Sequence, residues 1–405
     1  MSKFMPKLIH SSSGQPQTAL WLVLMFLFAF NFMSAGGYLL LGLMALYTVL
    51  HLREFSFRAA EVFLFVFGVE YFLFYFLWYQ GASLGDVCNY LVAPWLIYWM
   101  GRNMACRSSA DNLPLRAATA LTLGFWAYGL LCIIYSMYVA PPMAGSRLMY
   151  KFWDQTPLSV TSGGLLFPMA IGISMGQLTA RNKLRTRLFW LAVLGVCVYY
   201  CFTWAHRTTI YIIGILAVYN YLAFLFAMEV SPVRKTFLVL GSVLLASVVT
   251  LCLVLDVGGC HTWLQGQWLY QRLTDPLAAN SGSRFEIWSS FFSQWLLYPL
   301  GGKQFDISAS FVHNMWLDVY YLCGVLPFLA LLAATVRITA NVLRYRKVRA
   351  GDSRSAHILA NCFISVFLAF MVEPVMSAYP YVLLAMLLIS GCIDGAIMKA
   401  QQTES

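Results

Sequence analysis

Charged side chains are scarce in this sequence. They make up 10% of its 405 residues, whereas hydrophobic residues make up 60% and aromatic residues 16%. A soluble domain usually carries about 25% charged residues, which hydrate its surface. A chain with so few charges cannot solvate its exterior in water, and this excludes a large soluble protein. We therefore expect residues 1–405 to form a single integral membrane domain, most of which is covered by lipid.

Motifs for metal and redox chemistry are also missing. The ten cysteines include no CxxC pair, which excludes zinc-ribbon and thioredoxin-like sites. Most of these cysteines lie in apolar runs, where a thiol acts as a small hydrophobic group. No DxD or ExD pair of carboxylates occurs either. Nothing in the sequence therefore indicates a metal-dependent site, and we expect neither a metal nor a cofactor.

Acidic residues are few beside basic ones, with 16 Asp and Glu against 26 Lys and Arg. The basic residues form short clusters between apolar runs, at every second turn of the chain. This arrangement is typical of cytoplasmic loops rather than of a nucleic-acid-binding surface. It predicts a multi-pass protein of the bacterial inner membrane with both termini in the cytoplasm, in contact with membrane lipids and not with nucleic acid. Six basic residues are exceptions that fall on the outward side: Arg147, Lys151, Arg207, Arg272, Arg284 and Lys303.

The apolar runs predict an all-α, polytopic membrane protein of about 12 transmembrane helices, since each span needs about 20 residues. Two runs are too long for one span, and each must turn at its polar group, residues 188–228 at 203–209 and residues 355–397 at 373–380. The first run is expected to be an uncleaved span and not a signal peptide. The predicted spans are residues 18–33, 36–52, 59–79, 83–100, 117–139, 157–178, 188–203, 208–229, 235–256, 314–336, 355–375 and 377–397.

One long outward loop, residues 257–312, interrupts these spans and is expected to lie in the periplasm. Within it, the apolar positions of residues 284–300 have helical spacing, which predicts an amphipathic helix at the membrane interface. A purely structural interfacial helix accounts equally well for the apolar face. Its first residue, Arg284, is harder to explain this way, because a cation in the first turn opposes the helix dipole. An anion bound at this position would account for it.

Several outward-facing residues are candidates for chemistry. Arg207, Arg284 and Arg272 offer permanently charged forks suited to phosphate oxygens, and several such groups at one membrane surface favour a lipid diphosphate. His313 precedes a predicted helix, whose dipole disfavours the imidazolium form, so a neutral imidazole there is suited to act as a general base. The alternative is that His313 and Asn314 merely cap this helix. His206 lies in a turn, where a polar residue is expected in any case.

At these positions the sequence resembles the superfamily of O-antigen ligases and O-antigen polymerases of Gram-negative envelopes. The order and spacing of the motifs match this superfamily from about residue 160 to residue 330, and the first four spans match only in kind. The matching segments are Trp204-Ala205-His206-Arg207-Thr208-Thr209, Ser281-Gly282-Ser283-Arg284-Phe285-Glu286-Ile287-Trp288, Tyr298-Pro299-Leu300-Gly301-Gly302, His313-Asn314-Met315-Trp316-Leu317, and Gly324.

The resemblance implies a metal-independent, inverting glycosyltransferase that acts on undecaprenyl-diphosphate-linked glycans at the periplasmic face. It further implies that Arg207 and Arg284 bind the diphosphate and that His313 activates the acceptor hydroxyl. Members of the superfamily often carry Ser or Thr where this chain has His206, so the role of His206 is open between proton transfer and filling the turn. We expect substrate contacts also from Arg272, Lys303, Asn314, Glu286 and His206.

These motifs do not separate a polymerase of lipid-linked repeat units from a ligase that transfers the glycan to lipid A-core. The shortness of the outward loop favours the polymerase, for which the partners would be the undecaprenyl-diphosphate-linked donor, a glycan acceptor and a possible chain-length-regulating membrane protein. A third alternative is a transporter, or flippase, of lipid-linked glycans, which places ionisable residues along a membrane pathway. Candidates for such a pathway are Glu61, Glu70, Asp86, Asp318, Glu373 and Asp394, although Asp318 and Glu373 could instead line an outward cavity and assist catalysis.

Overall fold

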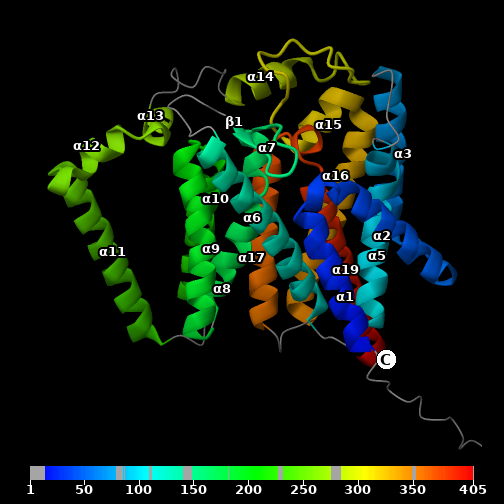
Figure 1. The fold of residues 1–405 in the computed structure, drawn as a ribbon, viewed down its shortest axis with the longest axis horizontal. Helices are drawn as coiled ribbons and strands as arrows, with labels where there is room; N and C mark the ends of the chain where they lie inside the picture. The colour runs from blue at the N-terminus through cyan, green and yellow to red at the C-terminus, as the bar shows by residue number, and fades with distance from the viewer. Residues whose placement is uncertain are drawn as a thin grey trace, which may run out of the picture.

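The protein is a bundle of long helices, and several of its short elements lie at the end opposite the C-terminus (Figure 1). The computed structural model describes residues 14–78, 85, 87–108, 112–139, 148–180, 182–226, 231–274, 284–348 and 353–404. The long helices are α1 (Gly14–Ala29), α2 (Gly36–His51), α3 (Ala59–Trp78), α5 (Ala93–Arg107), α6 (Leu113–Val139), α9 (Leu184–Thr203), α10 (Arg207–Phe226), α11 (Pro232–Val254), α16 (Val325–Val348), α17 (Ser353–Val372) and α19 (Tyr381–Glu404).

The short elements connect these helices. They are η1 (Phe32–Ser34), η2 (Leu52–Glu54), η3 (Val87–Val92), α7 (Val160–Gly164), α8 (Pro168–Thr179), η4 (Val257–Gly259), α12 (Cys260–Gln265), α13 (Trp268–Thr274), α14 (Arg284–Gln294), α15 (Met315–Cys323) and α18 (Val375–Ala378). Two short strands, β1 (Leu148–Tyr150) and β2 (Pro157–Ser159), pair in antiparallel fashion with Met149 opposite Leu158. The hairpin was not expected from the sequence.

Within the described ranges, nine helices are long and apolar enough to cross a membrane. They confirm an all-α, polytopic membrane protein. Both predicted turns inside the long apolar runs are also confirmed, because α9 ends at Thr203 and α10 begins at Arg207, while α17 ends at Val372 and α19 begins at Tyr381. The number of twelve spans stays a prediction, as does the placement of the loop at 257–312 in the periplasm.

Three predicted spans are not single continuous helices. The segment predicted as 157–178 consists of β2, α7 and α8, and Pro168 stands in the first turn of α8, where its missing N–H costs nothing. The segment predicted as 314–336 divides into α15 and α16 at Gly324, which has a φ of +88°. The described part of the span predicted as 83–100 contains the π-helical turn η3 before α5.

The predicted interfacial helix is present as α14, but it ends at Gln294 rather than near Leu300. Its buried residues, Ile287 and Phe291, lie one turn apart and face the bundle, while Phe285 is exposed. Beyond Gln294 the chain forms turns. Pro299 prevents the helix from continuing through this segment, because proline disrupts a helix interior. The apolar periodicity of residues 295–297 therefore belongs to a turn and not to the helix.

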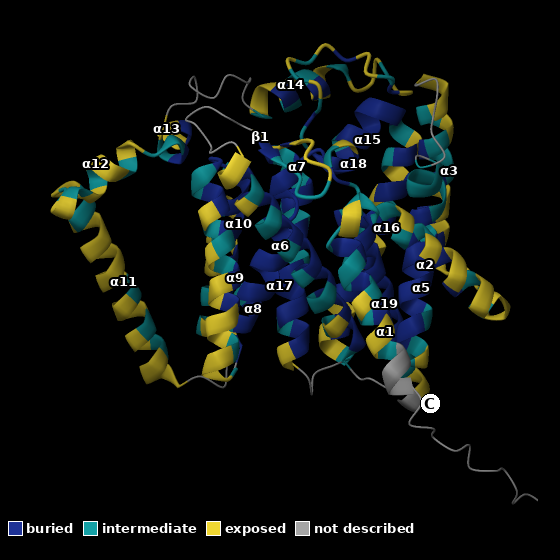
Figure 2. Ribbon diagram, viewed as in Figure 1, coloured by how far each residue is buried: buried dark blue, intermediate teal, exposed yellow. Residues whose placement is uncertain are grey.

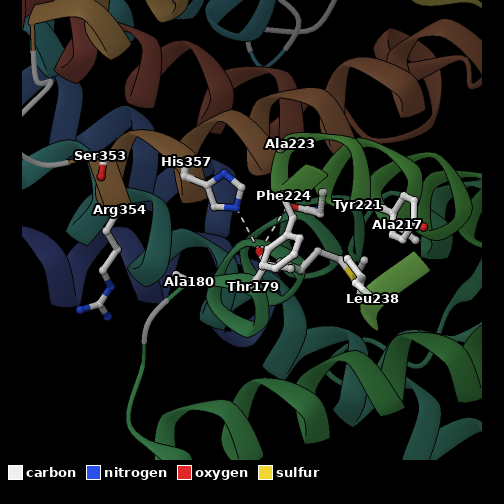
Figure 3. Close-up of a pocket in the computed structure, with 12 residues that line it drawn as sticks. Thr179, Ala180, Ala217, Tyr221, Ala223, Phe224, Leu238, Ser353, Arg354 and His357 are labelled. Atoms are coloured by element: carbon white, nitrogen blue, oxygen red, sulfur yellow. Dashed lines mark hydrogen bonds between the residues drawn. The ribbon is translucent and has the colours of Figure 1, made fainter. Parts of the chain in front are cut away.

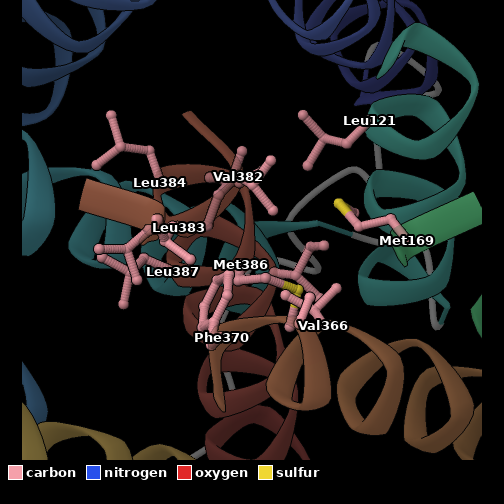
Figure 4. Close-up of a cluster of buried hydrophobic side chains, with 14 of the residues drawn as sticks. Leu121, Met169, Val366, Phe370, Val382, Leu383, Leu384, Met386 and Leu387 are labelled. Carbon is pink, nitrogen blue, oxygen red and sulfur yellow. The ribbon is translucent and has the colours of Figure 1, made fainter. Parts of the chain in front are cut away.

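The core lies where the central helices pack against one another. Side chains of α6, α8, α17 and α19 meet there, among them Leu121, Met169, Phe370 and Met386 (Figure 4). Burial is concentrated in these helices, whereas α11 stands apart and has no buried residue (Figure 2). Since every helix must satisfy its own backbone in lipid, α11 is stable there without close neighbours.

Candidate active site

The candidate site lies at the end of the bundle that carries α7, α14, α15 and α18 (Figure 2). It is built around the turn between α9 and α10. Ala205 adopts a left-handed conformation with φ of +49°, which reverses the chain within three residues. His206 follows, is buried, and has its Nδ1 2.9 Å from Thr209 Oγ1. A Cβ at Gly164 of α7 would lie 2.2 Å from His206 Nε2, so the glycine makes room for the imidazole.

The buried carboxylate of Glu373 joins this turn to α14. Glu373 directly follows α17, and its Oε1 accepts hydrogen bonds from Thr208 Oγ1 at 2.5 Å and from Arg284 Nη2 at 3.2 Å. The same oxygen lies 3.5 Å from His206 Nε2. The turn after α9 and the start of α14, far apart in the sequence, therefore converge on one carboxylate. This arrangement places Glu373 next to Arg284, and its role in an outward cavity stays a prediction.

The pKa of Glu373 reflects these contacts. Burial by itself would raise it, but the contact with His206, the charge of Arg284 and the hydrogen bond from Thr208 lower it to about 2. The group therefore carries a negative charge at neutral pH. This fixed anion holds the side chains of Arg284 and His206 near the same carboxylate oxygen.

Arg207 and Arg272 lie beside the same turn. Arg207 is half-buried and donates from Nη1 to the carbonyl of Arg272 at 3.4 Å. Arg272, on α13, is buried and donates to the carbonyl of Ala205 at 2.9 Å, and its guanidinium lies 5.5 Å from the centroid of Trp268. The side chain of Arg272 therefore stabilises the turn by a hydrogen bond to the backbone of the turn. Arg207 is the more exposed of the two cations.

His313 lies in the segment between α14 and α15. It is half-buried and has a left-handed backbone with φ of +58°. Asp318 holds the segment in place, because it accepts hydrogen bonds from the backbone nitrogens of Val312 and Asn314 at 2.7 and 3.3 Å. A non-glycine residue in this conformation is held there by its surroundings and is often found at functional sites.

Two further hydrogen bonds connect the His313 segment to the Glu373 cluster. Trp288, one turn after Arg284, donates from Nε1 to the carbonyl of Val312 at 2.8 Å. Asn314 donates from Nδ2 to the carbonyl of Met371, two residues before Glu373, at 3.0 Å. The structure thus brings His313 to the same region as Arg284 and Glu373.

Asn314 has a structural task at this place. It is buried, and its Oδ1 accepts hydrogen bonds from the backbone nitrogens of Trp316 and Leu317, so it caps the N-terminus of α15. The capping alternative is therefore confirmed for Asn314. Lys303 and Glu286, which were expected to contact substrate, are both exposed on the outward loop. The first three residues of the motif at 281–288 lie outside the described residues, as do Arg147 and Asp86.

Thr208 is the residue that sequence reasoning missed. It belongs to the motif at 204–209, but a hydroxyl in the first turn of a helix is common and gave no reason to single it out. Its contact with Glu373 depends on a residue 165 positions away. The sequence offered one related signal, an acidic residue directly after an apolar span. That signal points to Glu373 and not to Thr208.

The cluster combines an anionic carboxylate with two arginines and an imidazole at one end of a membrane protein. Such a set fits an anionic, hydroxyl-bearing substrate better than a cation. Across the described ranges, no group of three or more His, Cys, Asp or Glu residues is arranged to hold a metal ion. No protein-family model matches the chain, and no curated protein matches it significantly. The assignment of function therefore depends on this geometry and on the sequence motifs.

Proposed function

We propose that the protein is a metal-independent, inverting glycosyltransferase that polymerises undecaprenyl-diphosphate-linked oligosaccharide repeat units of O-antigen or a related surface polysaccharide. The observation that supports this proposal best is the convergence of Arg284, His206 and Thr208 on buried Glu373, with Arg207 beside the same turn. On this proposal the protein resides in the bacterial inner membrane, with both termini in the cytoplasm and the site facing the periplasm.

The proposed reaction needs two functions from the protein. The acceptor hydroxyl attacks the anomeric carbon from the face opposite the diphosphate, and His313 takes its proton as the new glycosidic bond forms. The bond from the anomeric carbon to the diphosphate oxygen breaks, and undecaprenyl diphosphate leaves with the electron pair. Arg207 and Arg284 stabilise the negative charge that develops on this leaving group.

Glu373 has a positioning role in this scheme. Its hydrogen bond occupies one end of the Arg284 fork, which fixes the plane of the guanidinium. A fixed fork aligns with two phosphate oxygens at a smaller entropic cost than a free side chain. Because Glu373 is already paired with Arg284, it does not leave an isolated anion near the diphosphate.

The test replaces the two proposed catalytic groups in cells. Arg284→Ala and His313→Ala should each reduce glycan extension at least about 10²-fold, the usual loss on removal of an electrostatic or acid-base group. Protein levels in the membrane should persist. Arg344→Ala, at an exposed position on α16 at the other end of the bundle, serves as the matched control and should extend glycan normally. Normal extension with either site variant contradicts the site assignment.

Deletion of the gene distinguishes the alternatives, with the cell's lipopolysaccharide separated on a gel. Core with a single repeat unit indicates the polymerase. Core alone with accumulation of lipid-linked polymer indicates the ligase that transfers glycan to lipid A-core. Failure of lipid-linked repeat units to reach the periplasm indicates the flippase. Loss of capsule with intact O-antigen indicates that the substrate is a capsule repeat unit.

A further inference from the structure

A second candidate site lies at the end of the bundle that holds the C-terminus. A cavity of about 680 Å³ opens there between the ends of α8, α10 and α17, and Leu238 of α11 lines its outer side (Figure 3). The cavity shares no residue with the cluster around Glu373. Its lining combines polar, apolar and cationic side chains.

Polar side chains form the inner wall of this cavity. Thr179 Oγ1 lies 3.0 Å from His357 Nε2 and 3.2 Å from Asn220 Oδ1. Asn220 in turn donates to Asn361 Oδ1 at 2.7 Å, and Asn361 donates back to Asn220 Oδ1 at 3.2 Å. Buried polar groups in a membrane bundle are expensive unless paired, and such groups generally mark a site or a specific contact. This network ties α8, α10 and α17 together behind the cavity.

Apolar side chains form the wall that faces the membrane. Phe224 of α10 and Leu238 of α11 line the cavity, Phe224 being 39% exposed and Leu238 half-buried. The hydroxyl of Tyr221 on α10 lies 3.1 Å from that of Ser242 on α11, which fixes the spacing of the two helices at this level. Because α11 has no buried residue, the apolar wall is open to lipid from the side.

One guanidinium group lines the cavity, and a second bonds to a residue of its lining. Arg354, near the start of α17, lines the cavity, is exposed, and makes no hydrogen bond or ion pair with any residue that the structure describes. Arg187 donates to the carbonyl of Ala180, which also lines the cavity, at 3.1 Å. The cavity therefore offers positive charge next to an apolar wall.

We propose that this cavity binds an anionic glycerophospholipid, with its phosphate at Arg354 and an acyl chain along the wall formed by Phe224 and Leu238. An amphiphile with one anionic head group matches both the cationic lining and the apolar wall. A zwitterionic lipid is disfavoured, because its ammonium group would lie close to the like-charged Arg354 and Arg187. A polyprenyl phosphate shares the phosphate chemistry, but the site lies at the opposite end of the bundle from Arg284 and therefore in the other leaflet.

The test measures lipid retention by the purified full-length protein in detergent, using native mass spectrometry with added dioleoyl-phosphatidylglycerol or dioleoyl-phosphatidylcholine. The wild type should retain the anionic lipid about tenfold more tightly, the order expected for a charge-assisted hydrogen bond to phosphate. Arg354→Gln should remove this preference. Ala217→Phe should weaken retention of both lipids, since Ala217 lines the cavity and its exposure leaves room for a larger side chain without disturbing the core.

Arg344→Gln is the matched control, because Arg344 is exposed and does not line the cavity. It should keep the preference for phosphatidylglycerol. Equal retention of the two lipids by the wild type, or an equal loss in Arg344→Gln and Arg354→Gln, overturns the proposal. Displacement of phosphatidylglycerol by an equimolar amount of undecaprenyl phosphate would also overturn it and assign the cavity to a lipid-linked intermediate. None of these outcomes depends on glycan transfer at the other end of the bundle.

Discussion

At the scale of single residues, the central feature is a buried carboxylate that pairs with an arginine and accepts a hydrogen bond from a hydroxyl. Glu373 is buried and accepts from Thr208 and Arg284, with His206 at 3.5 Å. Removing one partner of such a buried set leaves the others unbalanced, which typically costs about 3 kcal/mol or more. The acid therefore supports both the local fold and the orientation of Arg284.

Glu373→Gln tests this role. The neutral side chain keeps the size of glutamate but loses its charge, so we expect the unfolding temperature in detergent to fall and glycan extension to drop about tenfold or more. Asp306→Asn is the control, because Asp306 is an exposed acid outside the cluster around Glu373, and it should keep wild-type stability and extension. A Glu373→Gln protein with wild-type stability and extension would show that the carboxylate positions nothing.

The pH dependence of stability provides a separate prediction for the same residue. The folded state lowers the pKa of Glu373 from 4.5 to about 2, so the unfolded chain binds this proton more readily. The stabilisation is therefore complete above about pH 4.5 and is lost as the pH falls toward 2. The difference in unfolding free energy between the wild type and Glu373→Gln should be constant from pH 7 to 5 and shrink below that. A difference that grows on acidification would contradict the assigned charge state.

The sequence identified most of the residues that meet in the site but not what each of them contacts. Arg207, Arg284 and Lys303 were found because outward-facing cations break the charge pattern, yet only the structure separates buried contacts from exposed loop positions. Arg272 illustrates the limit. A guanidinium that binds a backbone carbonyl and one that binds a phosphate look the same in a sequence, and here the guanidinium donates to Ala205.

At the scale of helices, glycine contacts hold the centre of the bundle together. A Cβ built on Gly391 of α19 would lie 2.1 Å from the carbonyl oxygen of Tyr98, and one on Gly101 of α5 would lie 2.2 Å from that of Leu388. The two helices thus approach backbone to backbone. Close packing through small residues is a main source of helix association in lipid, where no hydrophobic force acts between helices.

Gly391→Val should therefore force α5 and α19 apart. Overpacking of this kind typically costs about 1–3 kcal/mol, and backbone cannot move aside as a flexible side chain would. We expect a lower unfolding temperature in detergent and less protein in the membrane. Gly241→Val on α11 is the control, because nothing lies within 4 Å of a Cβ at that position. Equal stability of the two variants would contradict this account of the packing.

Helix positions were predicted well where a polar group interrupts an apolar run and poorly where the interruption is itself apolar. The turns at 203–207 and 372–381 contain polar or proline residues. The break between α7 and α8 falls on Leu165, Leu166 and Phe167, which read as continuous span. The division at Gly324 arises from a tertiary contact, since Val325 donates to the carbonyl of Pro299 at 2.8 Å, and such a contact leaves no local pattern.

At the scale of the whole molecule, the two proposed sites occupy opposite ends of shared helices. Thr208 lies in the first turn of α10 and Asn220 lies toward its other end, while His357 lies in the first turns of α17, which leads to Glu373. The charge pattern predicts that the end with Glu373 faces the periplasm and that the end with Arg354 faces the cytoplasm. The orientation of the protein therefore decides which leaflet each site meets.

Cysteine labelling tests this orientation directly. All ten cysteines lie in the described ranges, and Cys260 on α12 is the exposed one among them. A membrane-impermeant maleimide should label the wild type in intact spheroplasts through Cys260, and Cys260→Ser should abolish that labelling. Ser353→Cys in the Cys260→Ser background places an exposed thiol at the other end and should react only after permeabilisation. The reverse pattern would place Arg284, Glu373 and His313 on the cytoplasmic side, where a periplasmic glycan polymerase could not act.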